Sequence, residues 1–238
     1  MPAKKTSKGL RVVRRILVLG LLAAVGMAGW NWVEDHPQHN PWAPLDLRDP
    51  IGLATATKLV ALRDDIDQCR AVLERSDIAY TALPQTGEGA CARPDRTRLT
   101  EFPLSPGNPA TTCPVAAAME LWLHQSVEPA ARDILGSGVA RFEHLGVYNC
   151  RLIRGSSDNW SQHATGNAID ISAIVLEDGR RISLLAGWEG ESDEAQFLRQ
   201  IRDGACGVFA VVLSPDYNAA HADHFHFDQG GNMMGVCR

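Results

Sequence analysis

Residues 161–172, SQHATGNAIDIS, decide the fold that we expect for this chain. From Ala168 onward polar and apolar side chains alternate, as they do along a half-buried strand. Gly166 stands just before that strand and lets the backbone turn tightly after His163, because glycine tolerates positive φ. His163 and Asp170 can therefore face a common point although seven residues separate them.

A second segment, residues 221–230 (HADHFHFDQG), carries two histidines with one residue between them. In an extended strand that spacing puts the imidazoles of His224 and His226 on one face, while the neighbouring phenylalanines pack into the core. Two imidazoles and a carboxylate drawn from the two segments make a three-ligand shell with a fourth position for water, as metal-assisted hydrolysis requires. Such a shell suits zinc, and spacing alone leaves manganese and iron as alternatives.

The N-terminus has the charge and hydropathy pattern of a membrane-targeting segment. Residues 1–15 contain six basic residues and no acidic one, and residues 16–33 form an apolar run of membrane length. Small residues around Met27 also fit a signal-peptide cleavage site, whose use would make the protein secreted. Trp30 and Trp32 are typical of interfacial anchors. We therefore expect an uncleaved single-pass anchor in the inner membrane, with the rest of the chain in the periplasm.

The remaining sequence divides into a linker and one domain. Residues 34–50 are polar and contain four prolines, which predicts a tether, and residues 51–238 are long enough to bury a core. Apolar residues at helical spacing predict helices over 51–76, 112–127 and 129–136 and from 192 onward. Thr112 is the expected cap of the second helix. Strands interspersed with helices, without a regular βαβ rhythm, indicate an α+β fold.

The charge of the chain argues against nucleic acid as a partner. The net charge is −5 for the whole chain. Beyond the six basic residues of the first fifteen, 17 Lys and Arg stand against 28 Asp and Glu, a net charge of −11. Surfaces that bind nucleic acid are basic, and no basic stripe follows residue 33. We expect the domain to be a monomer.

All the cysteines lie beyond the apolar run, in the compartment where disulfides persist. The six are Cys69, Cys91, Cys113, Cys150, Cys206 and Cys237. None forms a CxxC motif, which disfavours zinc-knuckle and thioredoxin-type sites. Proximity in sequence alone suggests the pairs Cys69–Cys91 and Cys206–Cys237.

Two motifs of this chain resemble those of known metallopeptidases. The first matches the pattern S-x-H-x-x-G-x-A-x-D at Ser161, His163, Gly166, Ala168 and Asp170. With the HxH motif downstream, it resembles the LAS metallopeptidases, which include lysostaphin-type endopeptidases and D-alanyl-D-alanine peptidases. Together with YNCRLIRGS at residues 148–156, the two segments resemble more closely the extensin-like C-terminal domain family of bacterial envelope proteins, over about residues 50–238.

The resemblance implies a small antiparallel sheet that carries a zinc site and is flanked by helices. It makes His163, Asp170 and His226 the zinc ligands. Many D-Ala-D-Ala peptidases have a glutamate three residues before the last ligand, where this chain has Asp223. Other members use the first histidine of HxH, which is His224 here. The general base is therefore either Asp223 or His224.

Other residues near the motifs are candidates for substrate binding. Arg151 and Arg154 precede the first motif, and a guanidinium can bind a terminal carboxylate of a peptide through two hydrogen bonds. A surface salt bridge is the alternative role for both arginines. Ser161 is expected to orient His163 or the substrate, and Tyr217 to line the cleft. We expect the remaining histidines outside the two motifs to be structural: His36, His39, His124 and His144.

The resemblance implies a zinc peptidase that acts on peptidoglycan peptides. The alternative is a non-catalytic envelope module with a structural zinc that binds peptidoglycan or a protein, because an aspartate at position 223 is one methylene shorter than the glutamate. A third hypothesis keeps the hydrolase but makes it an amidase that cuts between sugar and peptide.

Overall fold

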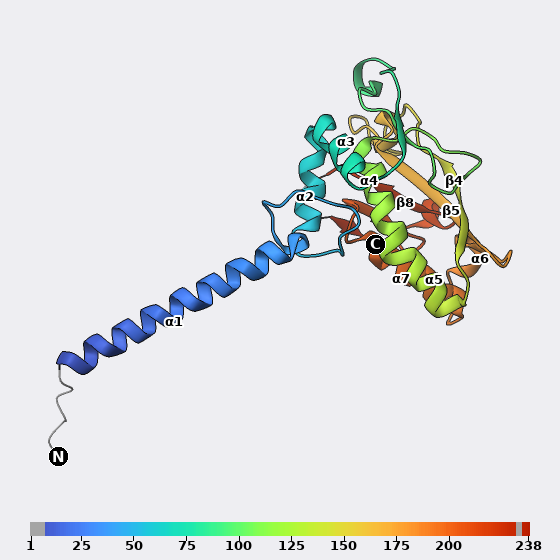
Figure 1. The fold of residues 1–238 in the computed structure, drawn as a ribbon. Helices are drawn as coiled ribbons and strands as arrows, with labels where there is room; N and C mark the ends of the chain where they lie inside the picture. The colour runs from blue at the N-terminus through green and yellow to red at the C-terminus, as the bar shows by residue number, and fades with distance from the viewer. Residues whose placement is uncertain (1–7, 232–234) are drawn as a thin grey trace.

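A long helix projects from a mixed α+β domain in the computed structural model, which describes residues 8–231 and 235–238 (Figure 1). This helix, α1 (Lys8–Asp35), contains a candidate membrane span over Gly9–Asp35, none of it buried against the domain. Its length and composition fit a membrane span and a signal sequence equally well. The expectation of an apolar helix near the N-terminus is confirmed to that extent.

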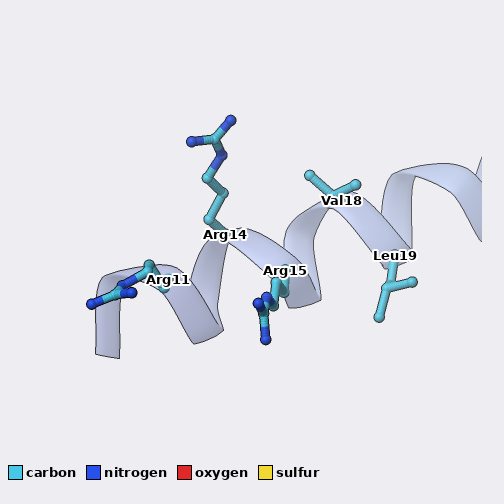
Figure 2. Close-up of a pocket in the computed structure, with 5 residues that line it drawn as sticks. All are labelled: Arg11, Arg14, Arg15, Val18 and Leu19. Carbon is cyan, nitrogen blue, oxygen red and sulfur yellow. The ribbon is translucent and has the colours of Figure 1, made fainter. Parts of the chain in front are cut away.

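Helix α1 begins earlier than the apolar run that starts at residue 16. The arginines expected in a separate basic flank therefore occupy its first turns, directly before Val18 and Leu19 (Figure 2). These arginines are Arg11, Arg14 and Arg15. The lysines at positions 4 and 5 lie outside the described residues.

The helices of the domain gather largely on one side of its main sheet (Figure 1). They are α2 (Thr55–Ala61), α3 (Ile66–Arg75), α4 (Cys113–Trp122), α5 (Glu128–Leu135), α6 (Leu184–Gly187) and α7 (Asp193–Ala205), with a π-helical turn at Leu123–Val127 and short 3-10 turns at Pro37–His39, Leu62–Asp64, Gly89–Cys91, Gln162–Thr165 and Ala219–His221. The single helix expected over 51–76 is broken, because the side chain of Asp65 accepts a hydrogen bond from the backbone N–H of Gln68 (2.9 Å) and begins α3 anew.

The main sheet has the strand order β3-β4-β5-β8-β7-β9 in the described part of the chain, with β6 paired to β5. Its strands are β3 (Leu104–Ser105), β4 (Val139–Gly146), β5 (Ala168–Leu176), β6 (Arg181–Ser183), β7 (Val211–Leu213), β8 (Phe225–Asp228) and β9 (Val236–Cys237). A separate ribbon pairs β1 (Tyr80–Ala82) with β2 (Thr97–Leu99). The central pairs are antiparallel, whereas β3–β4 and β7–β9 are parallel. The predicted α+β class is confirmed, and the sheet is mixed rather than purely antiparallel.

The apolar face of the sheet packs against α4 and α7. Trp122 of α4 contacts Phe142 of β4 and Phe227 of β8, with ring centroids 5.2 and 5.1 Å apart. Its indole N–H donates to the carbonyl of Ile201 in α7 (2.7 Å), so the polar atom of this buried ring is satisfied. Strand β5 buries Ile169 on this face. The next residue along the strand faces away from the helices, and this alternation leaves polar side chains on the open face.

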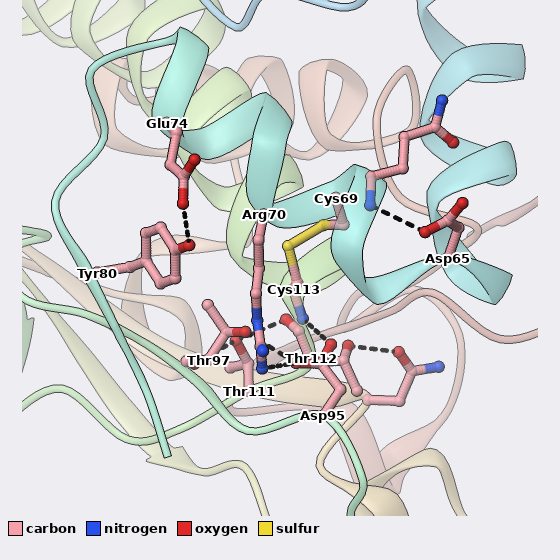
Figure 3. The surroundings of a disulfide bond; sticks show 12 residues. Asp65, Cys69, Arg70, Glu74, Tyr80, Asp95, Thr97, Thr111, Thr112 and Cys113 are labelled. Atoms are coloured by element: carbon pink, nitrogen blue, oxygen red, sulfur yellow. Dashed lines mark hydrogen bonds and ion pairs between the residues drawn. A yellow bond between two sulfur atoms is a disulfide. The ribbon is translucent and has the colours of Figure 1, made fainter. Parts of the chain in front are cut away.

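Three disulfides stabilise the domain. The expected Cys69–Cys91 pair is wrong, because Cys69 of α3 bonds to Cys113 at the start of α4 (Figure 3). Cys91 bonds to Cys150. Sequence proximity failed because α3 packs against α4, 44 positions further on. The Cys206–Cys237 pair is confirmed.

The segment expected to be a tether packs partly on the domain. Leu45 and Leu47 are buried in the core, and the N–H of Leu47 donates to the hydroxyl of Ser76 (2.8 Å). Arg75 donates to the carbonyl of Leu45 (3.0 Å). The segment 34–50 is therefore not a free linker along its length, because burial of its two leucines stabilises an ordered path over the domain.

Helix α4 begins at a carboxylate from a distant segment. The hydroxyl of Thr112, the expected cap, donates instead to Asn167 (2.7 Å). The buried carboxylate of Asp95 accepts hydrogen bonds from the Cys113 N–H and from the Thr97 hydroxyl (2.8 Å) (Figure 3). Arg70 lies 3.4 Å from the same carboxylate. The negative charge therefore sits at the positive end of the helix dipole.

We predict that Asp95→Asn lowers the free energy of unfolding by about 1–3 kcal/mol, because it removes a buried charge-assisted cap and the carboxylate partner of the half-buried Arg70. Urea unfolding followed by tryptophan fluorescence measures this change. The matched control is Asp178→Asn, which removes an exposed ion pair with Arg180 and should leave stability nearly unchanged. Equal stability of the Asp95→Asn variant and the parent would contradict the role of this cap.

Candidate metal centre

Strand pairing brings two of the three predicted ligands together. In the antiparallel pair β5–β8, Asp170 lies directly opposite His226. On the same two strands Ile171 lies opposite Phe225, and both of these side chains are fully buried. Since successive side chains of a strand point to opposite faces, burial of the apolar pair turns the acid and the imidazole to the open face.

The third ligand comes from the turn before β5. His163 lies in the 3-10 turn Gln162–Thr165, whose first backbone N–H groups are capped by the hydroxyl of Ser161 (3.3 Å to the His163 N–H). Gly166 ends this turn with φ +74° and leads the chain into β5. The positive φ favours glycine here, whereas a Cβ would meet only the guanidinium of Arg93, the movable end of a long side chain.

The three side chains form a tight triangle of donor atoms. His163 Nε2 lies 3.2 Å from Asp170 Oδ1 and 3.1 Å from His226 Nδ1. His226 Nδ1 lies 2.9 Å from Asp170 Oδ1. Ligands bonded at 2.0–2.1 Å to a tetrahedral ion stand about 3.3 Å apart, so the triangle has the size of one face of such a shell.

The other nitrogen of each imidazole is already engaged. His163 Nδ1 lies 3.0 Å from the carbonyl oxygen of Val147, and His226 Nε2 lies 2.9 Å from Asp228 Oδ2. Each of these nitrogens must carry the proton, because its partner can only accept. In the neutral rings the remaining nitrogens then direct lone pairs at each other and at the Asp170 carboxylate. Three lone pairs that converge in this way fit a cation, and these residues therefore fit a metal ion.

The charges of the centre also favour a cation at this point. Burial raises the pKa of Asp170, but hydrogen bonds with His163 and His226 outweigh it and hold the pKa well below its usual range. Burial lowers the pKa of His226, but Asp170 and Asp228 outweigh it and raise the pKa to about 9. The raised pKa of His226 thus favours a positive charge at the point where a cation would bind.

The centre lies in a cleft of about 620 Å³. The four predicted substrate-binding residues all line it: Arg151, Arg154, Ser161 and Tyr217. Among the described residues neither arginine makes an ion pair with a carboxylate; Arg151 donates to the neighbouring Leu152 carbonyl (3.2 Å). The alternative of a surface salt bridge therefore finds no support here.

The two candidates for the general base are in contact with each other. Asp223 is exposed, and its Oδ1 lies 2.8 Å from His224 Nδ1. The opposite nitrogen of that ring, His224 Nε2, lies 3.8 Å from Asp170 Oδ1. His224 lines the cleft. The pair is therefore a dyad whose imidazole faces the ligands and whose carboxylate lies behind the imidazole.

Sequence reasoning missed three parts of this site. His221 lies between Tyr217 and His224, with ring centroids 5.4 and 5.1 Å away, and burial together with His224 and His226 lowers its pKa to about 4. The sequence could have indicated this residue, because His221 is the first residue of the motif segment HADHFHFDQG. The i+2 spacing puts Asp228 on the strand face of His226, as the sequence predicts, but its role as the hydrogen-bond partner of that ring was not assigned. The third part is the backbone carbonyl of Val147, which contacts His163, and no sequence pattern indicates such a contact.

Comparison with known proteins identifies the family. The family model of the extensin-like protein C-terminus matches residues 67–238. The chain belongs to this family. The match includes every ligand and every cleft residue named above, whereas α1, the junction after it and α2 precede it. No curated protein and no solved structure matches the chain.

We predict that zinc affinity rises about tenfold per pH unit between pH 6 and 8, because zinc binds neutral imidazole and must displace the proton of His226. Because the pKa of His226 is about 9, this imidazole carries its proton throughout the range from pH 6 to 8, and zinc affinity falls as the pH falls. Competition with a chromophoric chelator measures the slope. His221→Gln should keep it, since that imidazole is already neutral above pH 6. A zinc affinity that does not change with pH would contradict the raised pKa of His226.

We also predict that Asp228→Asn weakens zinc binding by about 10-fold or more, because the neutral amide no longer orients and polarises the His226 ring. Calorimetric titration with zinc measures the change. Asp203→Asn is the matched control. This exposed carboxylate lies in α7, and within the described residues its ion-pair partner is Arg202. Unchanged affinity in the Asp228→Asn variant would show that the ring is held by other contacts.

Proposed function

We propose that this extensin-like chain is a zinc-dependent peptidase of the cell envelope that hydrolyses peptide bonds in the stem peptides or cross-links of peptidoglycan. The observation that carries the proposal is the convergence of three lone pairs at the base of an open cleft. A relation to the LAS peptidases, on the motifs given above, is part of the proposal.

His163, Asp170 and His226 would hold the ion, and mixed nitrogen and carboxylate ligands favour zinc. When bound, zinc lowers the pKa of a coordinated water toward ~7 and polarises the carbonyl of a substrate. Catalytic zinc sites have three protein ligands and an open position, and all three donors here line the cleft.

We assign the general base to His224. Its Nε2 faces the ligands, so it takes a proton from the attacking water and returns it to the leaving amine. Asp223 accepts a hydrogen bond from His224 Nδ1, which fixes the tautomer with a free Nε2 and stabilises the imidazolium that forms. Its exposed position behind the ring suits a positioning residue rather than the base.

Arg151 and Arg154 would bind the substrate carboxylate. Both line the cleft and lack a carboxylate partner within the described residues, so their guanidinium groups are available for a bidentate contact. The ring of Tyr217 lines the same cleft and offers a hydroxyl for a peptide carbonyl. Stem peptides of peptidoglycan, which end in a carboxylate, match this chemistry.

The proposed location is the inner membrane, with α1 as an uncleaved anchor and the domain in the periplasm. The arginines at the start of α1 favour a cytoplasmic N-terminus. The three disulfides favour an oxidising compartment.

Digestion of purified sacculi by the full chain, with and without a chelator, tests the function. We expect chelator-sensitive release of D-alanine or loss of cross-links in the mass spectrum of the products. Release of intact stem peptides from the sugar would indicate an amidase. Stoichiometric zinc without turnover on any cell-wall peptide would overturn the proposal and favour a non-catalytic module.

We predict that His224→Gln lowers kcat by about 10²–10⁴-fold and keeps one zinc per chain, because the variant loses the base but no ligand. His163→Ala should lose both the zinc and the activity. His144→Gln is the control, since this imidazole contacts the Gly107 carbonyl (3.1 Å) outside the cleft. Full activity of the His224→Gln variant would exclude it as the base.

A further inference from the structure

The connection between α1 and the domain is folded. The N–H of Ala54 donates to the carbonyl of Gln38 (3.0 Å), and the Lys58 ammonium donates to the carbonyl of Pro37 (2.7 Å). A Cβ at Gly52 would lie 2.4 Å from the Gln38 carbonyl oxygen, so the two backbones touch. With Leu45 buried in the core, no flexible spacer separates the helix from the domain. Figure 1 shows α1 leaving the domain beside α2.

An exposed tryptophan folds back along the end of α1. Trp42 has 82% of its surface exposed and lines a hollow of about 220 Å³ together with Trp30 and Val33 of the helix. Trp30 lies five residues before the end of α1, about 8 Å along its axis. Glu34, next to the end of α1, lines the same hollow, so Trp42 stands beside the last turns of the helix.

A second exposed apolar side chain lies near the end of α1. The N–H of Leu53, whose side chain is 85% exposed, donates to Nδ1 of His39 (3.2 Å). The His39 ring stacks on Trp32 of α1, with centroids 5.3 Å apart. Trp30 and Trp32 project about 200° apart around a helix axis. Apolar side chains thus surround the end of α1, and we call this set (Trp30, Trp32, Trp42 and Leu53) the junction collar.

We propose that the junction collar is a membrane-binding surface that seats the domain directly on the outer face of the bilayer in which α1 is anchored. The proposal rests on the proposed membrane location of α1 and not on the peptidase activity.

Continuity with α1 selects a bilayer as the partner. If α1 spans a membrane, Trp42 lies beside the last turns of the span, near the interface, where indole rings are favoured because one end is apolar and the other is wet. The residues beyond the basic flank carry a net charge of −11, so attraction to anionic lipids does not hold the domain there. Burial of apolar surface in the interface is the remaining contribution.

Fluorescence quenching in phosphatidylcholine nanodiscs tests the proposal with the full chain. Because all six native cysteines form disulfides, a label on Leu53→Cys has a single reactive thiol. The matched control is Leu185→Cys, at a position that is 68% exposed. Its helix, α6, lies on the side of the domain away from α1 (Figure 1). Gly20→Cys, in α1, reports insertion of the helix.

We expect a nitroxide near the glycerol level of the lipid to quench the label at position 53 at least ~3-fold more than the label at position 185. Adding Trp42→Ser should reduce that quenching and leave turnover of soluble peptides unchanged. Equal quenching at positions 53 and 185, or no quenching at position 20 by a deep nitroxide, overturns the proposal. Turnover of soluble muropeptides, measured in parallel, tests the peptidase separately.

Discussion

The antiparallel register of β5 with β8 is the constraint on which both the fold and the candidate metal centre depend. A slip of one residue would move every side chain of a strand to the other face. The buried pairs Ile171–Phe225 and Ile169–Phe227 oppose such a slip, because it would expose four large apolar side chains. The same register holds Asp170 opposite His226. Core packing therefore fixes the geometry of the ligands.

The centre is costly to build without a cation. Buried lone pairs of His163, His226 and Asp170 converge, and the hydrogen bonds that aim them are made to Val147 and Asp228. Those outer contacts leave the inner donor atoms facing one another, and their close approach is unfavourable unless a positive charge lies between them. A proton relieves part of this cost in the metal-free protein, as the raised pKa of His226 indicates.

Much of the site was readable from the sequence, because its parts follow local periodicities. The alternation of β5 and the HxH spacing place their side chains by geometry alone, and Gly166 marks the turn that returns His163 to the strand. The α+β class follows from the order of the predicted helices and strands, and the cleft position of Arg151 and Tyr217 follows from their place just before the two motifs. The break in the first domain helix was less accessible, since an aspartate cap at position 65 interrupts an apolar stripe that is otherwise continuous.

The sequence by itself determined which residues face a common point and which segment is apolar enough to cross a membrane. Only the tertiary structure decided the partners of those residues: the Cys69–Cys113 bond, the carboxylate of Asp95 at the start of α4, and the order of Asp223 behind His224. It also decided that the proline-rich segment is a folded junction. Local periodicity determines the direction of a side chain, whereas contacts between distant segments depend on how whole elements pack.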